Sequence, residues 1–240
     1  MATTAHPADE STAHGLIQGA SAGVVVVSSP ERQTVEVGFY ENQILPRFIN
    51  VALANRECTR IRRRVAAGLS GEVLEVGFGS GLNVPHYPDT VRRVQAVDPA
   101  TVGRKLAKER VKASQVPVDY VALDGQDLPI DSASVDHVLV TWTLCTIPDA
   151  RRALSEFRRV LRPGGGLHFV EHGRSPDAAV TRWQDRLTPL QRRLFGGCHL
   201  NRPIEALVAD AGLEVTRIEK YYMRGPKALG YMYEGMAVKA

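Results

Sequence analysis

Residues 73–83, with the sequence VLEVGFGSGLN, join an apolar run of strand length to three glycines at alternate positions, Gly77, Gly79 and Gly81. Glycine has no Cβ, so it adopts positive φ values and lets the backbone approach a ligand closely. A buried parallel strand that turns tightly into such a loop is typical of a site for a nucleotide-like ligand. The predicted cofactor-binding residues of this stretch are Glu75, Gly77, Phe78, Gly79, Ser80, Gly81 and Asn83.

The spacing of these glycines argues against a dinucleotide. The dinucleotide fingerprint Gly-x-Gly-x-x-Gly requires its third glycine at position 82, where this chain has Leu82. The pattern therefore disfavours NAD and FAD. A glycine-rich turn that binds no ligand is the alternative, because short motifs also occur by chance.

Acidic and polar residues follow the next two predicted strands. Residues 91–97 form a short strand that ends at Asp98, about 20 residues after the first glycine, where a carboxylate can accept both hydrogen bonds of a ribose diol. An isolated Asp-Pro pair is otherwise only a turn. Residues 118–123 form a third strand, and Asp124 or a neighbour in the polar turn after it can accept from an adenine amino group. The predicted cofactor-binding residues after these strands and the fourth strand are Asp98, Pro99, Asp124, Gly125, Gln126 and Thr141.

Aromatic and imidazole side chains are the candidates for contact with a second substrate. Residues 167–172 form a fifth strand that ends in Glu171 and His172. His172 is the candidate general base, because an imidazole titrates near neutral pH; the alternative is that it caps backbone groups or orients Glu171. Trp142 is either a wall of the cofactor pocket or part of the core, and Tyr40 lies on a helix that either covers the cleft or only packs on the sheet. The predicted acceptor-site residues are Tyr40, Trp142, His172 and His199.

The elements that must position these residues alternate along the chain. Apolar residues at helical spacing predict helices over residues 40–67, 101–114 and 149–161, and Pro46 is tolerated in the first of them only near a first turn or at a break between two helices. With the strands named above and a fourth over residues 134–140, this alternation predicts a doubly wound, mostly parallel α/β sheet. A last helix begins at Asn201-Arg202-Pro203 and closes at Gly212, and residues 214–219 and 231–238 form a C-terminal antiparallel hairpin.

The length and composition suit one α/β domain. The chain has 240 residues, of which 44% are hydrophobic, so it can bury a sizeable core. We predict a single domain over residues 40–240, preceded by a tail, residues 1–39, that is mobile or forms a partial lid. The net charge of +4 comes from arginine pairs and from a cluster at positions 60 and 62–64, and we expect most of these arginines on solvated helix faces. Because no aromatic residues alternate with these arginines, we expect no nucleic-acid partner.

The cysteines Cys58, Cys145 and Cys198 are odd in number and widely spaced, without a Cys-x-x-Cys pair. This spacing indicates neither a disulfide framework nor a zinc site, and no histidine pair has metal-ligand spacing on a helix, so no metal is predicted. A reducing cytosol fits these cysteines. The apolar run over residues 23–27 is too short for a signal sequence or a membrane span, so we expect a soluble, cytoplasmic protein.

The motifs as a set resemble the class I S-adenosylmethionine-dependent methyltransferases over about residues 70–175. The resemblance rests on Glu75-x-Gly77-x-Gly79-x-Gly81, on Asp98, on the turn at 124–129 and on the sequence LRPGG at 161–165. More narrowly, the sequences GSGLN at 79–83 with HYP at 86–88, VEH at 170–172 and GGCHLNR at 196–202 resemble the branch that contains the alkyl thiol methyltransferases. The thiol enzymes of that branch carry an amino-terminal hydrophobic anchor, which we do not expect in this chain, so we do not transfer their acceptor range as a whole.

The resemblance implies a Rossmann-like methyltransferase fold with seven strands and S-adenosylmethionine as the cofactor, with S-adenosylhomocysteine as the product. The reaction would be an in-line displacement at a sulfonium methyl group, in which positioning contributes on the order of 7–11 kcal/mol. A thiol with a pKa near 8.5 needs little help to ionise, whereas a phenol near 10 would benefit from a base such as His172. We therefore expect a small-molecule thiol acceptor. The alternatives are a phenolic, quinol-like or lipid amine acceptor, and a non-catalytic regulatory module that only binds S-adenosylmethionine.

Overall fold

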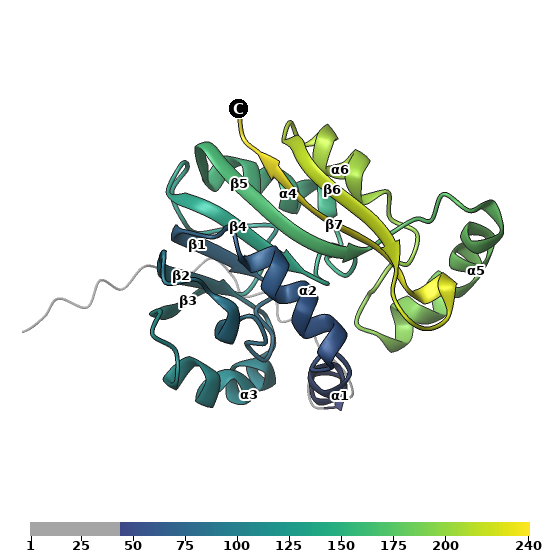
Figure 1. The fold of residues 1–240 in the computed structure, drawn as a ribbon, viewed down its shortest axis with the longest axis horizontal. Coiled ribbons are helices and arrows are strands. Elements are labelled where there is room, and N and C mark those ends of the chain that lie inside the picture. The colour runs from purple at the N-terminus through teal and green to yellow at the C-terminus, as the bar shows by residue number, and fades with distance from the viewer. Residues whose placement is uncertain (1–43) are drawn as a thin grey trace, which may run out of the picture. The chain divides into compact units, whose positions relative to one another are not determined.

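The computed structural model describes residues 44–240, except for the side chain of Pro46. In this part of the chain, seven strands form one sheet in the order β3-β2-β1-β4-β5-β7-β6 (Figure 1). The strands are β1 (Gly71–Val76), β2 (Val91–Val97), β3 (Val118–Ala122), β4 (Val135–Thr141), β5 (Leu161–His172), β6 (Glu214–Tyr222) and β7 (Tyr231–Val238). β7 runs antiparallel to β5 and β6, and the other pairs are parallel. The predicted doubly wound, mostly parallel sheet with a C-terminal antiparallel hairpin is therefore confirmed.

Helices cover both faces of this sheet. The helices are α1 (Leu45–Ala52), α2 (Arg56–Ala66), α3 (Thr101–Lys112), α4 (Ala150–Val160), α5 (Ala178–Leu194) and α6 (Ile204–Asp210), with the short 3-10 helices η2 (Val84–His86) and η3 (Lys227–Leu229). In Figure 1, α2 lies in front of the sheet and α4 lies behind it. Successive residues of β1 show the same division, because Val73 packs with Ile61 of α2, whereas Leu74 packs in the cluster that contains Phe157 of α4.

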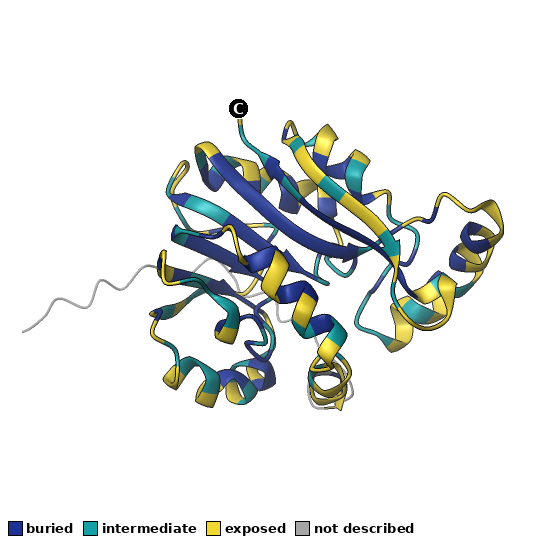
Figure 2. Cartoon of the chain, viewed as in Figure 1, coloured by how far each residue is buried: buried dark blue, intermediate teal, exposed yellow. Residues whose placement is uncertain are grey.

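The central strands are apolar on both faces because each face meets a helix layer. Val138, Leu139 and Val140 of β4 are all fully buried, although they alternate between the two faces. Figure 2 shows the same burial along β5 and β7, whereas the edge strand β6 carries many exposed residues. The middle of the sheet is thus a rigid base for the loops that follow β1 and β4.

Helix α2 is fixed at its start and near its end. At the start, the side chain of Asn55 accepts hydrogen bonds from the backbone N–H groups of Glu57 and Cys58, both at 2.9 Å. Near the end, the Arg64 guanidinium binds the Glu234 carboxylate of β7 with two hydrogen bonds, at 2.9 and 2.6 Å. These contacts hold the helix against the sheet and so fix the side chains that α2 directs toward the site.

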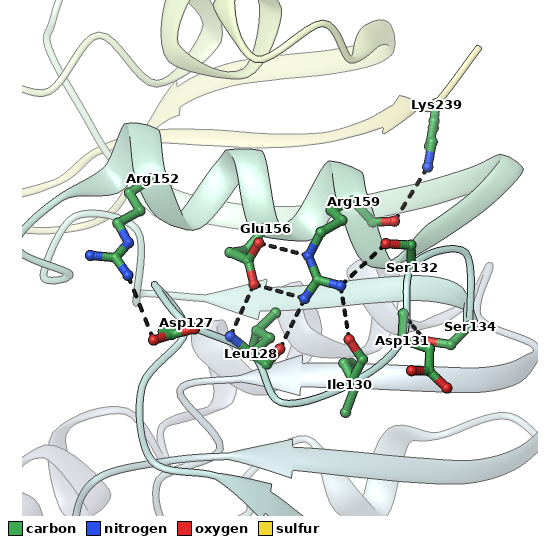
Figure 3. A network of polar contacts seen from close by, with 10 residues as sticks. All are labelled: Asp127, Leu128, Ile130, Asp131, Ser132, Ser134, Arg152, Glu156, Arg159 and Lys239. Atoms are coloured by element: carbon green, nitrogen blue, oxygen red, sulfur yellow. Dashed lines mark hydrogen bonds and ion pairs between the residues drawn. The ribbon is translucent and has the colours of Figure 1, made fainter. Parts of the chain in front are cut away.

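Helix α4 holds the loop that leads from β3 to β4 (Figure 3). Arg159 donates to the carbonyl oxygens of Leu128 and Ile130, at 2.9 and 2.8 Å, and pairs with Glu156 at 2.7 Å. Glu156 in turn accepts from the Leu128 N–H at 3.0 Å. Several backbone polar groups of the loop are therefore bonded to one helix, which steadies the turn at residues 124–126 just before it.

Two features of the fold differ from the sequence-based expectation. The predicted helix over 149–161 ends at Val160, and the strand predicted to begin at residue 167 already begins at Leu161, which pairs with Val135. Residues 162–165 form an irregularity in the pairing with β4, where Gly164 adopts a φ of +76° and donates its N–H to the Lys239 carbonyl at 2.8 Å. Helix α5, which contains Pro189, was not predicted at all.

Some predictions cannot be compared with the described residues. The tail over residues 1–39, and with it the predicted domain boundary, lies outside them, and so does Tyr40. Within residues 44–240, none of the helices combines the length and the apolar character that crossing a lipid bilayer would require.

Candidate active site

A cavity of about 880 Å³ lies where the carboxyl ends of β1, β2, β3 and β4 meet. In open parallel sheets this is the edge where ligands bind, beside the point at which the strand order reverses. The predicted site residues that line the cavity are Gly77, Phe78, Gly79, Ser80, Asp98, Pro99, Asp124, Gly125, Thr141 and Trp142. The predicted site residues that lie elsewhere are Glu75, Gly81, Asn83, Gln126, His172 and His199.

The glycine loop after β1 is shaped by close backbone contacts. Gly77 has a φ of +77°, and a Cβ at this position would overlap the side chain of Thr143. A Cβ on Gly103, at the start of α3, would lie only 2.8 Å from the carbonyl oxygen of Gly79. Both positions require glycine for the loop to pass between β4 and α3. Gly103 was missed from the sequence, because it lies in a helix and outside the motif.

Asp98 is fixed by the backbone on both sides of it. One carboxylate oxygen accepts from the Gly79 N–H at 2.6 Å, and the other accepts from the Ala100 N–H at 2.7 Å. Burial raises the pKa of this carboxyl above its ordinary value, while the two backbone hydrogen bonds act in the opposite direction. Each oxygen of a carboxylate can accept more than one hydrogen bond, so Asp98 retains acceptor capacity toward the cavity.

The turn after β3 contains Asp124, whose carboxylate is held in place by Gln126. Gln126 donates to Asp124 from its backbone N–H at 2.8 Å and from its side-chain amide at 2.9 Å. The amide oxygen of Gln126 accepts from the Asp149 N–H at 2.8 Å. Gln126 therefore orients Asp124 rather than lining the cavity itself. Gly125 packs closely against Val76, since a Cβ at position 125 would lie only 2.6 Å from a Val76 methyl carbon.

A buried polar network lies directly beneath the glycine loop. Glu75 is 1% exposed and accepts hydrogen bonds from the Asn83 amide, at 3.0 Å, and from the Tyr87 hydroxyl. Burial raises the pKa of Glu75 to about 7. The Asn83 amide also donates to the Thr141 hydroxyl at 3.1 Å, which joins the loop after β1 to the end of β4. Glu75 and Asn83 thus support the cavity floor without reaching the cavity.

Arg62 of α2 also belongs to this network. It was not predicted as a site residue. Its Nη1 donates to Asn83 Oδ1 and to Thr141 Oγ1, both at 2.8 Å. Arg62 is 5% exposed and lines the cavity, and its Cζ lies 4.7 Å from the centroid of the Trp142 ring. Its Nε is buried and has no hydrogen-bond partner among residues 44–240. Burial lowers the pKa of Arg62 to about 10, so the side chain remains charged at neutral pH.

Arg62 is therefore an exception to the expectation that most of these arginines lie on solvated helix faces. The buried residues of this helix are Cys58, Ile61, Arg62, Val65 and Ala66. These positions follow the 3- and 4-residue spacing of a core-facing helix stripe. An arginine at such a position, among apolar neighbours, was the sequence signal that could have identified it.

Trp142 lies in the cavity wall with an unusual backbone. Its φ of +53° falls in the left-handed region, which is uncommon for any residue with a bulky side chain. The Trp142 N–H donates to the Val170 carbonyl at 2.8 Å, which holds the strained conformation in place. The indole lies under the Arg62 guanidinium and lines the cavity, and it also packs against the apolar cluster that contains Ile61 and Val73.

The two histidine candidates lie behind the wall. His172 Nδ1 is 3.9 Å from the sulfur of Cys145 and 3.9 Å from the sulfur of Cys198. His199 Nδ1 is 3.2 Å from the Cys145 carbonyl oxygen. Neither imidazole lines the cavity, so the role of His172 as a general base stays a prediction. Glu171 beside it accepts from the Thr143 and Cys145 N–H groups at 2.8 and 3.0 Å and shapes the turn after β4.

Comparison with known proteins agrees with this geometry. The family model described as "Methyltransferase domain" matches residues 74–169. Thiol S-methyltransferase TMT1B of Homo sapiens is 36% identical over 175 residues, which cover 68% of this chain and 71% of that protein. Phosphatidylethanolamine N-methyltransferase of Cereibacter sphaeroides is 31% identical and aligns with 65% of this chain and 77% of its own length.

Solved structures show the same fold. A putative methyltransferase from Bacillus halodurans superposes with a TM-score of 0.60 at 17% identity, over 76% of this chain and 96% of that one. Geranyl diphosphate methyltransferase in complex with SAM superposes with a TM-score of 0.59 at 13% identity, over 76% and 84% of the two chains. The family match, the similarity to the thiol enzymes and this shared fold agree. The chain belongs to the class I S-adenosylmethionine-dependent methyltransferases, in the branch of the thiol S-methyltransferases.

Proposed function

We propose that this enzyme transfers the methyl group of S-adenosylmethionine to the sulfur of a small-molecule thiol. The observation that carries the choice of acceptor is the 36% identity to a thiol S-methyltransferase over 71% of that protein's length. The positions of the charged side chains that line the cavity support the same choice.

Three charged side chains of the cavity wall suit three parts of the donor. Asp98 accepts the hydrogen bonds of the ribose diol, and Asp124 accepts from the adenine amino group. Arg62 binds the carboxylate of the methionine moiety with the edge of its guanidinium that carries Nε. Nε is a buried nitrogen left without a partner among the described residues, and a guanidinium fork matches a carboxylate in geometry. The donor would thus lie along the glycine loop from α3 to α2.

The reaction itself requires little from acid–base groups. The thiol loses its proton to solvent, the thiolate attacks the methyl carbon, and the carbon–sulfonium bond breaks with its electrons going to the departing sulfur. S-Adenosylhomocysteine leaves as a neutral thioether, so no general acid is needed. What the protein contributes is alignment of the two sulfurs about the methyl group and exclusion of water.

The part of the cavity wall beyond Trp142 suits an apolar thiol that reacts as its thiolate. Its apolar members are Leu45, Ile49, Leu53, Ile147 and Phe195. Arg192 and Arg193, at the end of α5, also line the cavity, and their positive charge favours an anionic nucleophile. Among the described lining residues the carboxylates are Asp98 and Asp124, both assigned here to the donor. A thiol with a pKa near 8.5 reacts at neutral pH without a further base.

An amine or phenol is the second candidate acceptor. The 31% identity to a phosphatidylethanolamine N-methyltransferase, over 77% of that protein's length, specifically favours the amine. The apolar wall suits a lipid-like acceptor as well as a hydrophobic thiol. The indole of Trp142, which lines the cavity, would stack on the ring of a phenol.

A competition between matched acceptors tests the proposal. An alkyl thiol, a phenol and a primary amine of similar hydrophobicity are offered together with isotopically labelled S-adenosylmethionine, and methylated products are identified by mass spectrometry. We expect the thioether to form fastest, with Asp98→Ala as the negative control for donor binding. Methylation of the amine or phenol without methylation of the thiol would refute the choice of acceptor.

A further inference from the structure

Three side chains that carry metal-ligand atoms converge outside the cavity. The sulfurs of Cys145 and Cys198 are 3.7 Å apart, and His172 Nδ1 is 3.9 Å from each of them. Both cysteines are free thiols, 1% and 6% exposed. All three ligand atoms lie within 4.8 Å of one another, and no other group of this kind was found among residues 44–240. The reaction proposed above uses none of these atoms.

The three residues come from separate parts of the fold that the backbone holds together. Cys145 lies in the turn after β4, His172 ends β5, and Cys198 lies in the loop after α5. The His199 N–H donates to the Cys145 carbonyl at 2.7 Å, which ties the loop after α5 to the turn after β4. Gly197 has a φ of +90°, and a Cβ on it would lie 3.1 Å from the Thr146 carbonyl oxygen. The close approach of the two sulfurs is therefore built into the backbone.

The separations match those around a tetrahedral zinc ion. Zinc–sulfur bonds of about 2.3 Å and a zinc–nitrogen bond of about 2.05 Å place two sulfurs about 3.8 Å apart and sulfur and nitrogen about 3.6 Å apart. The sulfurs already stand at 3.7 Å, and the His172 ring would move by a few tenths of an ångström. We propose that Cys145, His172 and Cys198 bind a single Zn²⁺ ion, which nothing in the family assignment requires.

The charges of this ligand set suit a buried site. Zn²⁺ displaces the proton of each thiol, and both protons go to the buffer. Two thiolates and a neutral imidazole then balance the charge of the ion, so no net charge is buried. Three protein ligands leave one corner of the tetrahedron for a water molecule or another small donor, as in sites with an open position.

A bound ion at this place would act on the cavity wall. Thr146, which follows Cys145, and Gly197, which precedes Cys198, both line the cavity on its proposed acceptor side. Cross-linking their neighbours through zinc would fix the distance between these two wall segments. The ion would therefore position the wall, without touching the donor.

Metal content and spectroscopy of the full chain test this proposal. The protein is purified under reducing conditions without chelators, incubated with Zn²⁺, desalted and analysed for metal and for chain concentration. We expect one zinc per chain. In the Co²⁺-substituted protein we expect a near-ultraviolet thiolate-to-cobalt charge-transfer band and the intense visible bands of tetrahedral cobalt. Folded protein that retains no zinc and gives only the weak spectrum of aqueous cobalt would overturn the proposal.

Matched variants locate the site. Cys145→Ser and Cys198→Ser should each lose the charge-transfer band and weaken zinc binding by more than the roughly 10- to 100-fold that loss of an outer-shell partner costs. Cys58→Ser is the control, because Cys58 is also buried and free but lies on α2 outside the cluster. Metal binding that survives both cluster variants, or a Cys145–Cys198 disulfide formed in place of metal uptake, would contradict the proposal. The wild-type cobalt spectrum decides the matter even if a variant does not fold.

Discussion

Replacing Arg62 by methionine should weaken the binding of ligands that carry the methionine carboxylate and leave other adenosyl ligands unaffected. Methionine keeps an unbranched apolar chain against Trp142 but has no guanidinium. The lost interaction is the bidentate one between the carboxylate and the guanidinium edge whose Nε has no partner among the described residues. Because Arg62 is only 5% exposed, the interaction is shielded from water.

The size of the effect follows from that burial. Removing one partner of a buried, hydrogen-bonded charge pair costs 2–5 kcal/mol, and we take about 2–4 kcal/mol because the donor carboxylate can regain some water. This corresponds to a roughly 30- to 700-fold higher Kd for S-adenosylhomocysteine. For 5′-methylthioadenosine, which has the same nucleoside but no carboxylate, the Kd should change by no more than about twofold.

Isothermal titration calorimetry of both ligands against both proteins measures this difference. Arg63→Met is the matched control, because Arg63 is the next residue of α2 and is exposed. Thermal unfolding of each variant shows whether the loss of the contacts to Asn83 and Thr141 has disturbed the fold. An equal loss of affinity for the two ligands would refute carboxylate recognition by Arg62, and so would unchanged affinity for S-adenosylhomocysteine.

Three further predictions concern the same end of the sheet. Asp98→Ala should raise the Kd of S-adenosylhomocysteine by at least about 30-fold, since charge-assisted hydrogen bonds to the ribose are lost; calorimetry in which the affinity is unchanged would exclude Asp98 from the site. Gly103→Ala should weaken donor binding and lower the melting temperature together, because its Cβ would lie 2.8 Å from the Gly79 carbonyl oxygen. Glu75 should make the protein less stable as the pH rises from about 4.5 to about 7, because burial holds its folded-state pKa at about 7 and the unfolded chain releases the proton earlier. That difference is worth up to about 3 kcal/mol, and Glu75→Gln should remove it from urea unfolding curves measured across this range; identical pH profiles would contradict it.

The parts of the fold that sequence could predict are those with strong local patterns. Strand β2 and the hairpin of β6 and β7 follow from strand-length segments bounded by turn residues. The glycine spacing and Asp98 could be assigned because both follow strands of a parallel sheet, whose carboxyl ends meet at one edge. Helix α5 has no comparable signal, because Pro189 interrupts its pattern and Trp183 and Leu190 are exposed.

The residues that sequence missed depend on contacts between distant segments. Arg62 was assigned to a solvated face because it belongs to an arginine cluster, and only the burial of α2 against the glycine loop shows otherwise. The cluster of Cys145, His172 and Cys198 has no motif spacing, since 27 and 26 residues separate the neighbouring members. Their convergence comes from the parallel order of β4 and β5 and from the loop after α5, and spacing rules for metal sites do not detect it.

A crystal structure of the enzyme with S-adenosylhomocysteine tests the central claim most directly, namely that the cavity at the carboxyl ends of β1 to β4 holds the methyl donor. We expect the ribose hydroxyls within hydrogen-bonding distance of Asp98 and the methionine carboxylate on the Nε edge of Arg62. The sulfur should face the wall formed by Trp142 and Thr146. A ligand bound outside this cavity, or bound in it with its carboxylate turned away from Arg62, would contradict this account of the site.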